Sequence, residues 1–504
     1  DLGTTYSAVA CVDEYGKPIV LKNTDGQTTT PSVVFVDPPH YAVGEVALQS
    51  TMTDPSKVVQ FIKRFMGVTD FRVHIGEFAL SPEFISSIIL RKLVQDAQDE
   101  LGEEITAVVI TVPAYFTEAQ RQATHEAGTL AGLNVLRIIN EPTAAALSYG
   151  ISRRGRPRNI LVYDLGGGTF DVTVLEVDNE SLNVLAIGGD SHLGGKDWDD
   201  RVMNFIEDEL KEKFGYEIEA DPILEAELRL KAEAAKRQLS GRPSVPITFK
   251  AKRNIASATG TMETFIPVRI ELTREKFDSM TSDLLGRTEM LLESIMRKAN
   301  LTWDDISETL CVGGSSRMPM VRELLVKLSG KRALLHDPDE CVAKGAALQA
   351  ALLTQDETVE EVNVGHVLAH SLGVATSRNG RTLIDHIIPA LTPLPCSQSR
   401  DGYTTTEDNQ TSVQVRIYEG ESTDPEAYPN GPIGVFNLDV SPPRPKGRPN
   451  IKVEFRCDEN GRIMAIARDK DTGKESRTLI SLAGERSDVE VAEEANLLSQ
   501  AVIS

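Results

Sequence analysis

The 504-residue chain has little of what marks several protein classes. Its five cysteines are scattered without C-x-x-C spacing, so neither a disulfide framework nor a zinc site is expected. Buried free thiols in a reducing compartment fit this pattern better. No apolar run approaches the ~18 residues of a membrane-spanning helix. We therefore expect a cytoplasmic protein. The cysteines are Cys11, Cys311, Cys341, Cys396 and Cys457.

Positive charge is also scarce, with 53 Lys and Arg against 75 Asp and Glu and a net charge of −22. This balance argues against non-specific binding to nucleic acid or to an anionic membrane, because both need a basic face. Apolar residues make up 40% of the chain, which is ample for buried cores. The length suggests about three domains. The first residue is Asp1, without a methionine or a lead-in strand, and we take the start to be missing.

Two copies of a short glycine-containing pattern dominate the sequence, DLGTT at residues 1–5 and DLGGGT at residues 164–169. The second copy lies between strand-like runs at 159–163 and 170–177, which together predict a β-hairpin. Tip glycines let backbone N–H groups approach anionic oxygens, and the aspartate can hold a hydrated Mg²⁺. Two such hairpins facing each other would clamp a di- or triphosphate. For either copy alone, a simple turn remains the alternative.

The first 355 residues alternate predicted strands and helices, which suggests a two-lobed α/β body with a central cleft. Residues 107–112 (AVVITV) predict a buried strand. Thr117 and Gln120 form a capping box for the next helix. Pro82, after Ser81, favours the start of another helix. The stretch 223–240 predicts a third, amphipathic helix.

After residue 355 the pattern changes. Residues 356–370 are acidic and then mildly apolar, and we interpret them as an interdomain linker. Short alternating runs separated by turn residues then predict a β-sandwich over 371–484. A helix is expected from Ser487 within 485–504, with no helical lid in this chain. The runs are 411–418, 434–440, 451–455 and 462–467, with a hairpin turn at Asn460-Gly461.

Seven longer motifs are spread along nearly the full length of the chain: DLGTTYS at 1–7, VITVPAYF at 109–116, RIINEPTAAAL at 137–147, YDLGGGTFDVTVLE at 163–176, GDSHLGG at 189–195, VGGSSRMPMV at 312–321 and TEDNQTSV at 406–413. In these motifs the chain resembles the 70-kilodalton heat-shock protein (DnaK-like) molecular chaperones. Actin and sugar kinases are similar only in the phosphate hairpins. The resemblance implies an α/β actin-like (ribonuclease-H-like, duplicated) two-lobed ATPase domain at 1–355, followed by an all-β sandwich that binds peptide.

The resemblance also implies roles for single residues in binding and hydrolysing ATP, with ATP or ADP, Mg²⁺ and K⁺ as cofactors. Lys63 would reach the γ-phosphate and the attacking water, and Glu141 would help to position that water. A solvated lysine and a helix-start glutamate are the alternatives for the two taken singly. The other expected site residues have roles in catalysis, metal binding and nucleotide contact. Catalysis also involves Asp164 and Thr169; the metal carboxylates are Asp1, Asp164 and Asp171; nucleotide contacts come from Gly3, Thr4, Thr5, Gly166, Gly167, Gly168, Thr169, Gly194, Gly195, Glu233, Lys236, Arg237, Ser240, Gly313, Gly314, Ser315, Arg317 and Asp339.

Partners follow from the same resemblance: unfolded or extended peptide segments, a J-domain co-chaperone and a nucleotide exchange factor, with no nucleic acid and no membrane. Filling of the sandwich core is the alternative role for the valines expected to bind peptide. The expected peptide-binding residues are Val374, Tyr403, Val413 and Val415; Arg137 and Asn140 match positions facing J-domain partners, and Pro113 and Arg121 match an interlobe switch.

Three departures from the family pattern bear on regulation. The linker reads EVNVGH at 361–366 instead of a leucine run bounded by aspartates, and the lost contacts predict docking weaker by ~3 kcal/mol and weak coupling to peptide. His366 replaces an aspartate, which predicts reduced stimulation by a J-domain or a specialised partner. Ser377 and Thr406 predict a more polar arch over the peptide, with altered specificity.

We expect an ATP-hydrolysing chaperone that couples nucleotide state to peptide binding. The alternative is a chaperone-like regulator that binds ATP, hydrolyses it negligibly and acts through partner docking.

Overall fold

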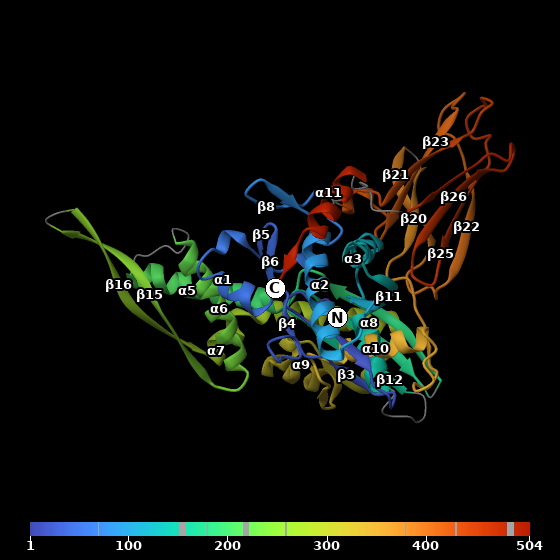
Figure 1. The fold of residues 1–504 in the computed structure, drawn as a ribbon. Coiled ribbons are helices and arrows are strands. Elements are labelled where there is room, and N and C mark those ends of the chain that lie inside the picture. The colour runs from blue at the N-terminus through green and yellow to red at the C-terminus, as the bar shows by residue number, and fades with distance from the viewer. Residues whose placement is uncertain are drawn as a thin grey trace.

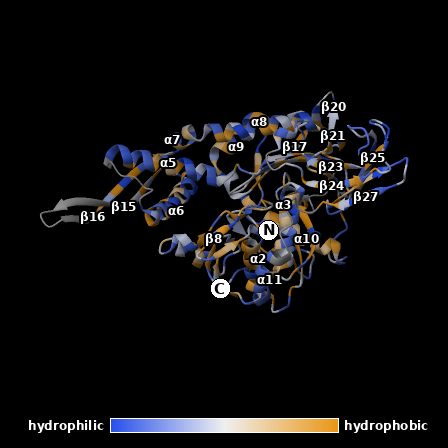
Figure 2. Ribbon diagram, turned by 90° about the horizontal axis from the view of Figure 1, so that it is seen from above, coloured by the Kyte–Doolittle hydropathy of each residue, from blue (hydrophilic) through white to orange (hydrophobic). Residues whose placement is uncertain are grey.

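The computed structural model describes residues 1–68, 70–150, 158–178, 180–214, 221–257, 260–378, 380–428, 431–480 and 488–504. The chain folds into a mixed α/β body, from which a β-hairpin projects at one end and an all-β part at the other (Figure 1). Figure 2 shows the same arrangement from above, with β16 and the labelled strands β25 and β27 at opposite ends.

A six-stranded sheet in the order β18-β17-β12-β13-β14-β19 forms the centre of the body. The hairpin predicted around the second glycine pattern is confirmed, because β12 and β13 pair antiparallel with Leu165 opposite Phe170. Alternate residues of β12 enter different cores, Leu161 and Tyr163 one and Ile160 and Val162 the other. Burial on both faces explains the continuous apolar run. The strands are β12 (Arg158–Leu165), β13 (Phe170–Val177), β14 (Ser181–Asp190), β17 (Ile306–Val312), β18 (Ala333–Leu335) and β19 (Asn363–Val364).

Helices cover both faces of this sheet. One core contains residues of α4 and α10, and the other contains residues of α5, α6, α8 and α9. The predicted amphipathic helix at 223–240 is confirmed as α6, one residue earlier at each end. The helices are α4 (Glu141–Gly150), α5 (Gly195–Phe214), α6 (Pro222–Leu239), α7 (Arg274–Met280), α8 (Ser282–Ala299), α9 (Pro319–Ser329) and α10 (Cys341–Leu353); the projecting hairpin is β15 (Ser244–Ser257) and β16 (Gly260–Thr273).

The N-terminal region packs smaller sheets against two helices. The predicted strand at 107–112 is confirmed as β10, which pairs in parallel with β11. Both predicted helix starts are confirmed: Ser81 caps α2, and Thr117 with Gln120 forms the capping box of α3. Residues of these two strands and two helices belong to one hydrophobic core. The elements of the N-terminal region are β1 (Tyr6–Ser7), β2 (Ala10–Val12), β3 (Pro18–Val20), β4 (Thr30–Pro31), β5 (Val34–Asp37), β6 (His40–Val43), α1 (Glu45–Ser50), β7 (Val58–Val59), β8 (Val73–Ile75), β9 (Phe78–Leu80), α2 (Pro82–Leu101), β10 (Ala107–Val112), α3 (Glu118–Leu130) and β11 (Asn134–Asn140).

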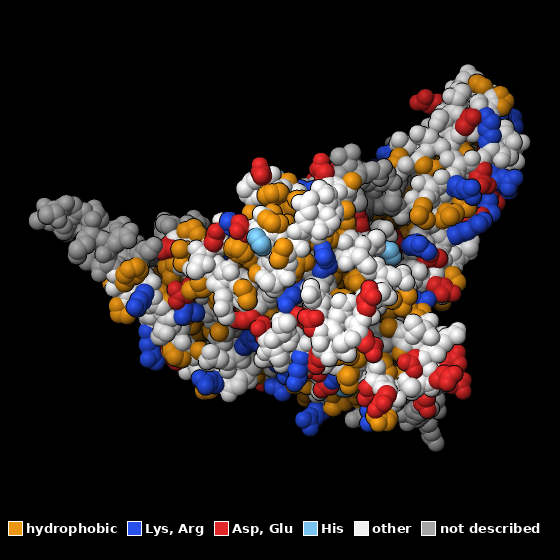
Figure 3. Space-filling model, in the orientation of Figure 1, with side chains coloured by type: hydrophobic (Ala, Val, Ile, Leu, Met, Phe, Trp, Pro, Cys, Tyr) orange, Lys and Arg blue, Asp and Glu red, His pale blue; other side chains and the backbone are white. Residues whose placement is uncertain are grey.

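Two four-stranded antiparallel sheets, β21-β20-β23-β24 and β22-β25-β26-β27, make up the all-β part. Strands of both sheets contribute to one hydrophobic core, as the alternating pattern predicted. The Asn460-Gly461 turn joins β25 to β26, with Gly461 at φ +88°. Lys and Arg side chains gather over this part on the face that Figure 3 shows. The strands are β20 (Leu372–Arg378), β21 (Arg381–Ile388), β22 (Cys396–Tyr403), β23 (Ser412–Glu419), β24 (Gly434–Asp439), β25 (Ile451–Cys457), β26 (Ile463–Asp469) and β27 (Glu475–Leu479).

The predicted linker lies against the body. Its strand β19 extends the central sheet in parallel with β14, and Val359, Val362 and Val364 pack against one of the two cores. The N–H of Gly365 donates to the Leu182 carbonyl at 2.8 Å. A Cβ on Gly365 would lie 3.0 Å from Asn183 Oδ1 and 3.3 Å from the Leu182 carbonyl oxygen, so a larger side chain there would need these neighbours to shift by a few tenths of an ångström.

The last described segment, 488–504, returns to the N-terminal region. The predicted helix is present as α11 (Asp488–Ser499), and Ser487 lies outside the described residues. Both carboxylate oxygens of Glu494 accept hydrogen bonds from Ser81, and Leu498 enters the N-terminal core. Strand β28 (Val502–Ile503) then pairs in parallel with β6. Of the helices described, none is long and apolar enough to cross a membrane.

Candidate functional site

A cavity of about 310 Å³ opens between the N-terminal region and the six-stranded sheet, within the size range of small-molecule sites. It brings together most of the residues expected to bind nucleotide. Gly168, Gly194, Gly195 and Asp171 do not line it. The expected residues that do are Asp1, Gly3, Thr4, Thr5, Lys63, Glu141, Asp164, Gly166, Gly167, Thr169, Glu233, Lys236, Arg237, Ser240, Gly313, Gly314, Ser315, Arg317 and Asp339.

The two glycine patterns face each other across this cavity. A Cβ built on Gly167 would collide with the Thr5 side chain, and one on Gly168 would collide with Thr4. Glycine is therefore needed at both positions for the turns to approach this closely. The predicted opposition of the two hairpin tips is present in the structure.

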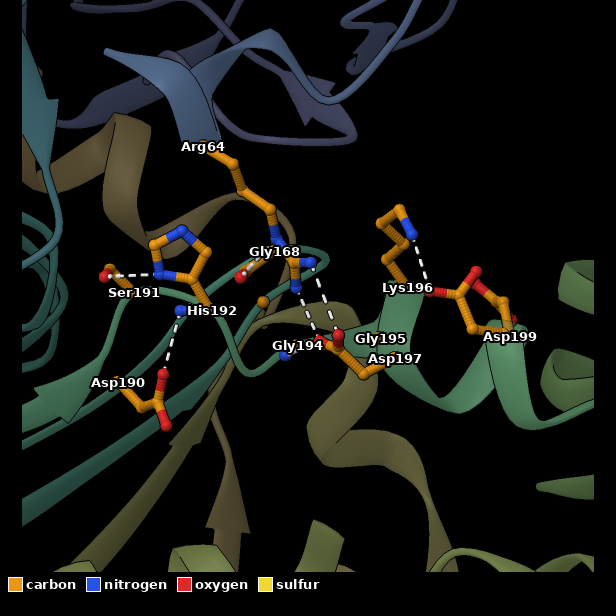
Figure 4. Close-up of polar contacts among 12 residues, drawn as sticks. Arg64, Gly168, Asp190, Ser191, His192, Gly194, Gly195, Lys196, Asp197 and Asp199 are labelled. Carbon is orange, nitrogen blue, oxygen red and sulfur yellow. Dashed lines mark hydrogen bonds and ion pairs between the residues drawn. The ribbon is translucent and has the colours of Figure 1, made fainter. Parts of the chain in front are cut away.

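A third turn at 194–197 supports the second glycine pattern. The Gly195 and Lys196 N–H groups donate to the Gly166 and Gly167 carbonyls at 2.9 and 2.8 Å. Arg64 joins the two turns, because its Nε donates to the Gly168 carbonyl at 2.9 Å and its guanidinium pairs with Asp197 at 2.5 Å (Figure 4). Asp197 in turn accepts the Gly194 N–H at 2.7 Å. Gly194 and Gly195 thus support the second glycine pattern without lining the cavity, and their contact with nucleotide stays a prediction.

The floor of the cavity carries a buried group of charges. Lys63 Nζ lies 2.5 Å from Glu141 Oε1, and the two residues are only 4% and 8% exposed. Burial, then Glu141 and Asp171, raise the pKa of Asp164. Burial and then Glu141 raise the pKa of Asp171 to about 8. With three carboxylates around one ammonium, the group would be stabilised by a further cation.

The donor set fits a hydrated magnesium ion bound with a phosphate. The described residues contain no group of three or more His, Cys, Asp or Glu able to hold a metal by themselves. Mg²⁺ is usually bound through one or two carboxylates, with phosphate and water completing its octahedron. The Asp1 carboxylate accepts a hydrogen bond from Thr111 at 2.8 Å, and Asp171 accepts the Tyr115 N–H at 3.0 Å. These bonds hold both carboxylates in place.

The α6 wall of the cavity is held by polar contacts. Lys236 Nζ donates to the Gly195 carbonyl at 2.9 Å and pairs with Asp199 at 2.8 Å. The pKa of Asp199 is raised to about 6 by burial, against the opposing effect of Lys236. Arg237 donates to the Tyr6 hydroxyl at 3.1 Å. On the opposite wall, Arg317 and Asp339 form an ion pair at 2.5 Å.

Several cavity residues were not expected from the sequence. Tyr6 and Asp199 line the cavity and bond to residues that were expected there. Arg64 follows Lys63 in FIKRF, and Asp197 follows GDSHLGG, so proximity to those motifs was the only available signal. Nothing local in the sequence marks Asp199, since its role depends on the packing of α5 against α6.

The residues expected to sense partners lie where the body contacts the all-β part. Arg137 pairs with Glu459 at 3.0 Å, while Arg121 hydrogen-bonds Asn140. Pro113 follows β10 at the same edge. His366 is half-buried beside them, and burial, then Arg137 and Arg121, lower its pKa to about 4.

Further contacts at this boundary involve Glu118, the first residue of α3. Its N–H donates to both carboxylate oxygens of Glu419, at 3.1 and 3.0 Å. His370 Nε2 lies 3.1 Å from the Tyr115 carbonyl oxygen.

The expected peptide-binding residues occupy two environments. Val374 and Val415 are 3% and 5% exposed and belong to the core between the two sheets. Val413 is partly buried against that core, and the half-buried Tyr403 donates to Asp385 at 2.8 Å. Burial of the first two valines is compatible with the core-filling alternative, and peptide binding by all four stays a prediction.

Comparison with known proteins shows the family to which this chain belongs. The family model described as "Hsp70 protein" matches residues 1–75 and 69–501. The chain belongs to the Hsp70 family of ATP-dependent molecular chaperones, which hydrolyse ATP. It is 41% identical over 483 residues to "Chaperone protein DnaK" of Thermosipho melanesiensis, covering 95% of this chain and 79% of that relative. The family membership predicted from the motifs is confirmed.

Proposed function

We propose that this chain hydrolyses ATP in the cavity between its two lobes and uses the nucleotide state to control peptide capture by the β-sandwich. The observation that carries the proposal is the Lys63–Glu141 pair, buried below two facing glycine turns. In phosphoryl transfer, positioning and charge neutralisation supply most of the catalysis. The non-hydrolysing regulator is not favoured, since the family hydrolyses ATP.

Each part of the cavity has a distinct proposed role. N–H groups and hydroxyls of the two turns bind the phosphates. Lys63 places a positive charge beside the γ-phosphate, where negative charge redistributes during transfer. Glu141 holds that ammonium and orients the attacking water. The proposed metal carboxylates are Asp1, Asp164 and Asp171, for Mg²⁺ and K⁺; the proposed nucleoside walls are Glu233, Lys236, Arg237 and Ser240 on one side and Gly313, Gly314, Ser315, Arg317 and Asp339 on the other.

The domain division supports this function. We assign 1–355 to an actin-like ATPase domain, because each lobe carries one glycine-tipped turn, and 356–370 to the linker. We assign 371–484 to the peptide-binding sandwich, which would hold peptide in an extended pose. We assign 485–504 to a final segment, in which the described residues 488–504 add a helix and a strand that rest on the first lobe. Arg121, Arg137 and His366 are half-buried at the boundary, which supports coupling there, with a J-domain and an exchange factor as proposed partners.

A single-turnover ATPase assay on the full chain tests the active site. Lys63→Ala should lower the rate of hydrolysis by ~10²-fold or more while ADP still binds. Lys57→Ala removes an exposed ammonium from a surface pair with Asp37 and serves as the matched control. Equal rates in Lys63→Ala and the unmodified chain would overturn the catalytic role of Lys63.

Peptide coupling has its own test. The polar linker predicts that a bound peptide raises the ATPase rate only weakly. Stimulation as strong as in a relative with a leucine-rich linker would contradict weak coupling. A peptide array tests the polar arch at Ser377 and Thr406, and an ordinary preference for leucine-rich segments would contradict altered specificity.

A further inference from the structure

Two free cysteines stand directly opposite each other in the β-sandwich. Cys396 is the first residue of β22 and Cys457 the last residue of β25, and the two are register partners in an antiparallel pair (Figure 1). Opposite residues in such a pair point to the same face, with Cα atoms ~4.5–5.5 Å apart. A disulfide needs Cα atoms ~4.4–6.8 Å apart, so the register itself brings these thiols within bonding reach.

The two thiols lie close enough to shift each other's pKa. Cys457 is 3% exposed and belongs to the sandwich core, while Cys396 is partly buried against it. Burial, and then the neighbouring Cys396 thiol, raise the pKa of Cys457. Burial raises the pKa of Cys396, and its hydrogen bond with Cys457 opposes this. The electrostatics therefore agree with the register.

None of the other cysteines has such a partner. Cys11 stands opposite Ile19, and Cys311 stands between Tyr163 and Leu335. Cys341 begins α10. Two cysteines thus stand opposite each other at one position in the fold, and this arrangement does not arise from a high cysteine content.

The pair lies at the end of the sandwich that faces the ATPase body. Two residues before Cys396, the Leu394 N–H donates to the carbonyl oxygen of His366 in the linker at 2.9 Å. Two residues after Cys457, Glu459 pairs with Arg137 of the body at 3.0 Å. A bond between the thiols would join the strand that contacts the linker to the strand that contacts the body.

We propose that Cys396 and Cys457 form a dithiol modification site, which a peroxide oxidises to an intramolecular disulfide that fixes β22 to β25 beside the linker. The inference is independent of the residue roles proposed for ATP hydrolysis. It assigns to the sandwich a chemistry that its peptide-binding role does not require.

The oxidation proceeds in two balanced steps. Cys396 is the more accessible of the two cysteines, and its thiolate attacks one oxygen of the peroxide. The O–O bond breaks, and the second oxygen takes a proton and leaves as water. The Cys457 sulfur then attacks the Cys396 sulfenic acid, forming the S–S bond and releasing a second water. Two thiols lose two electrons and two protons in total, and one hydrogen peroxide is reduced to two waters.

The environment sets the rate of this reaction. Because the thiolate is the nucleophile, raised thiol pKa values make the first step slow near neutral pH. The second step is favoured, because the register holds the partner sulfur next to the oxidised one. The site therefore accumulates disulfide under sustained exposure and does not respond to brief pulses of peroxide.

Peroxide treatment of the full, reduced chain followed by mass analysis tests the site. We expect a loss of about 2 Da and one cross-linked peptide pair containing Cys396 and Cys457, both reversed by dithiothreitol. Hydrogen exchange of the β22 and β25 amides should slow in the oxidised chain. Oxidation of Cys396 to sulfinic acid without a cross-link, or a bond to another cysteine, would overturn the proposal.

Single substitutions supply the controls. Cys396→Ser and Cys457→Ser should each abolish the cross-link and the slower exchange. Cys11→Ser removes a half-buried, unpaired thiol and should change neither. If Cys457→Ser, a buried change, destabilises the sandwich, the partly exposed Cys396→Ser variant still decides the outcome. A cross-link that persists in Cys396→Ser would contradict the assignment.

Discussion

The ammonium of Lys63 donates a hydrogen bond to Oε1 of Glu141 across 2.5 Å, with both residues almost fully removed from water. Lys63 comes from a short 3₁₀ turn at Ile62–Phe65, and Glu141 is the first residue of α4. The pair therefore connects the two regions that enclose the cavity. Because neither side chain lies on the exposed surface, a substitution of either residue should change the rate of ATP hydrolysis.

Replacing Glu141 by glutamine should separate hydrolysis from binding. The amide keeps the size of the side chain but loses the negative charge that holds Lys63 and orients water, so the single-turnover rate should fall by ~10²-fold. ADP affinity should change only a few-fold, because loss of the Glu141 charge lowers the raised pKa values of Asp164 and Asp171, whose carboxylates can then balance Lys63. Glu271→Gln, on the exposed projecting hairpin, is the control. A fall in affinity equal to the fall in rate would contradict a role in the chemical step.

Gly167→Ala should weaken nucleotide binding. The added Cβ collides with the Thr5 side chain, so the two turns must separate. Overpacking of this kind costs ~1–3 kcal/mol, which corresponds to a loss of ADP affinity of roughly fivefold to 150-fold by calorimetry. Gly286→Ala is the matched control, because nothing lies within 4 Å of its added Cβ. Equal ADP affinity in both variants would show that the close approach of the turns is not needed.

Glu419 should support the contact between the sandwich and the body through its acceptor oxygens rather than its charge. Glu419→Ala leaves the buried Glu118 N–H without its acceptor, at a cost of ~1–3 kcal/mol. Glu419→Gln keeps an acceptor and removes the repulsion with the Glu118 carboxylate, so docking should be retained. Cleavage at Glu357, Glu360 and Glu361 by a glutamate-specific protease measures linker exposure. Faster cleavage in both variants would show that the charge is required.

His366 should make docking sensitive to pH. Its pKa is lowered to about 4 in the docked chain, so the docked state binds fewer protons than the undocked state. The stabilisation of the docked state by neutral His366 is complete above the ordinary histidine pKa of ~6.5. It is lost as the pH falls toward the lowered pKa. Burial raises the pKa values of Glu118 and Glu419, so these two carboxyl groups favour the docked state as the pH falls.

The His366 contribution can be isolated by substitution. Small-angle scattering should show the unmodified chain expanding more on acidification than His366→Asn, which keeps only the opposing carboxylates. Identical pH profiles for the two chains would exclude His366 as the titrating group.

His366→Asp should increase stimulation of the ATPase by a J-domain. The new carboxylate would face Arg137 and Arg121, which now lie near a neutral imidazole. A steady-state assay with added J-domain measures the gain, and the basal rate should change little. No gain in stimulation would count against the idea that this position limits the response.

Local signals predicted most of the fold. The alternation in 170–177, the capping residues Ser81 and Thr117, and the Asn460-Gly461 turn each appear where expected, because periodicity and caps act over a few residues. The short motifs predicted most of the residues that were expected to line the cavity for the same reason. Asp199 was missed, because its place depends on the packing of α5 against α6. Tyr6 was overlooked although it directly follows the first glycine pattern, since its hydrogen bond to Arg237 joins elements distant in sequence.

Linker docking was also hard to anticipate. The polar residues of 361–366 gave no sign that β19 would join the central sheet, since a ladder uses backbone groups that every residue carries. The same argument explains why the pairing of β28 with β6 was not foreseen.

The pairing of β28 with β6 has a consequence for biosynthesis. Ser504 and Tyr41, joined by backbone hydrogen bonding at 2.9 Å, are separated by 463 positions along the chain. Translation proceeds from the N-terminus at ~5–20 residues per second, so β6 waits for tens of seconds with one edge open. During that interval the nascent lobe presents an unpaired strand edge, and a ribosome-associated holdase that shields such edges would favour productive folding.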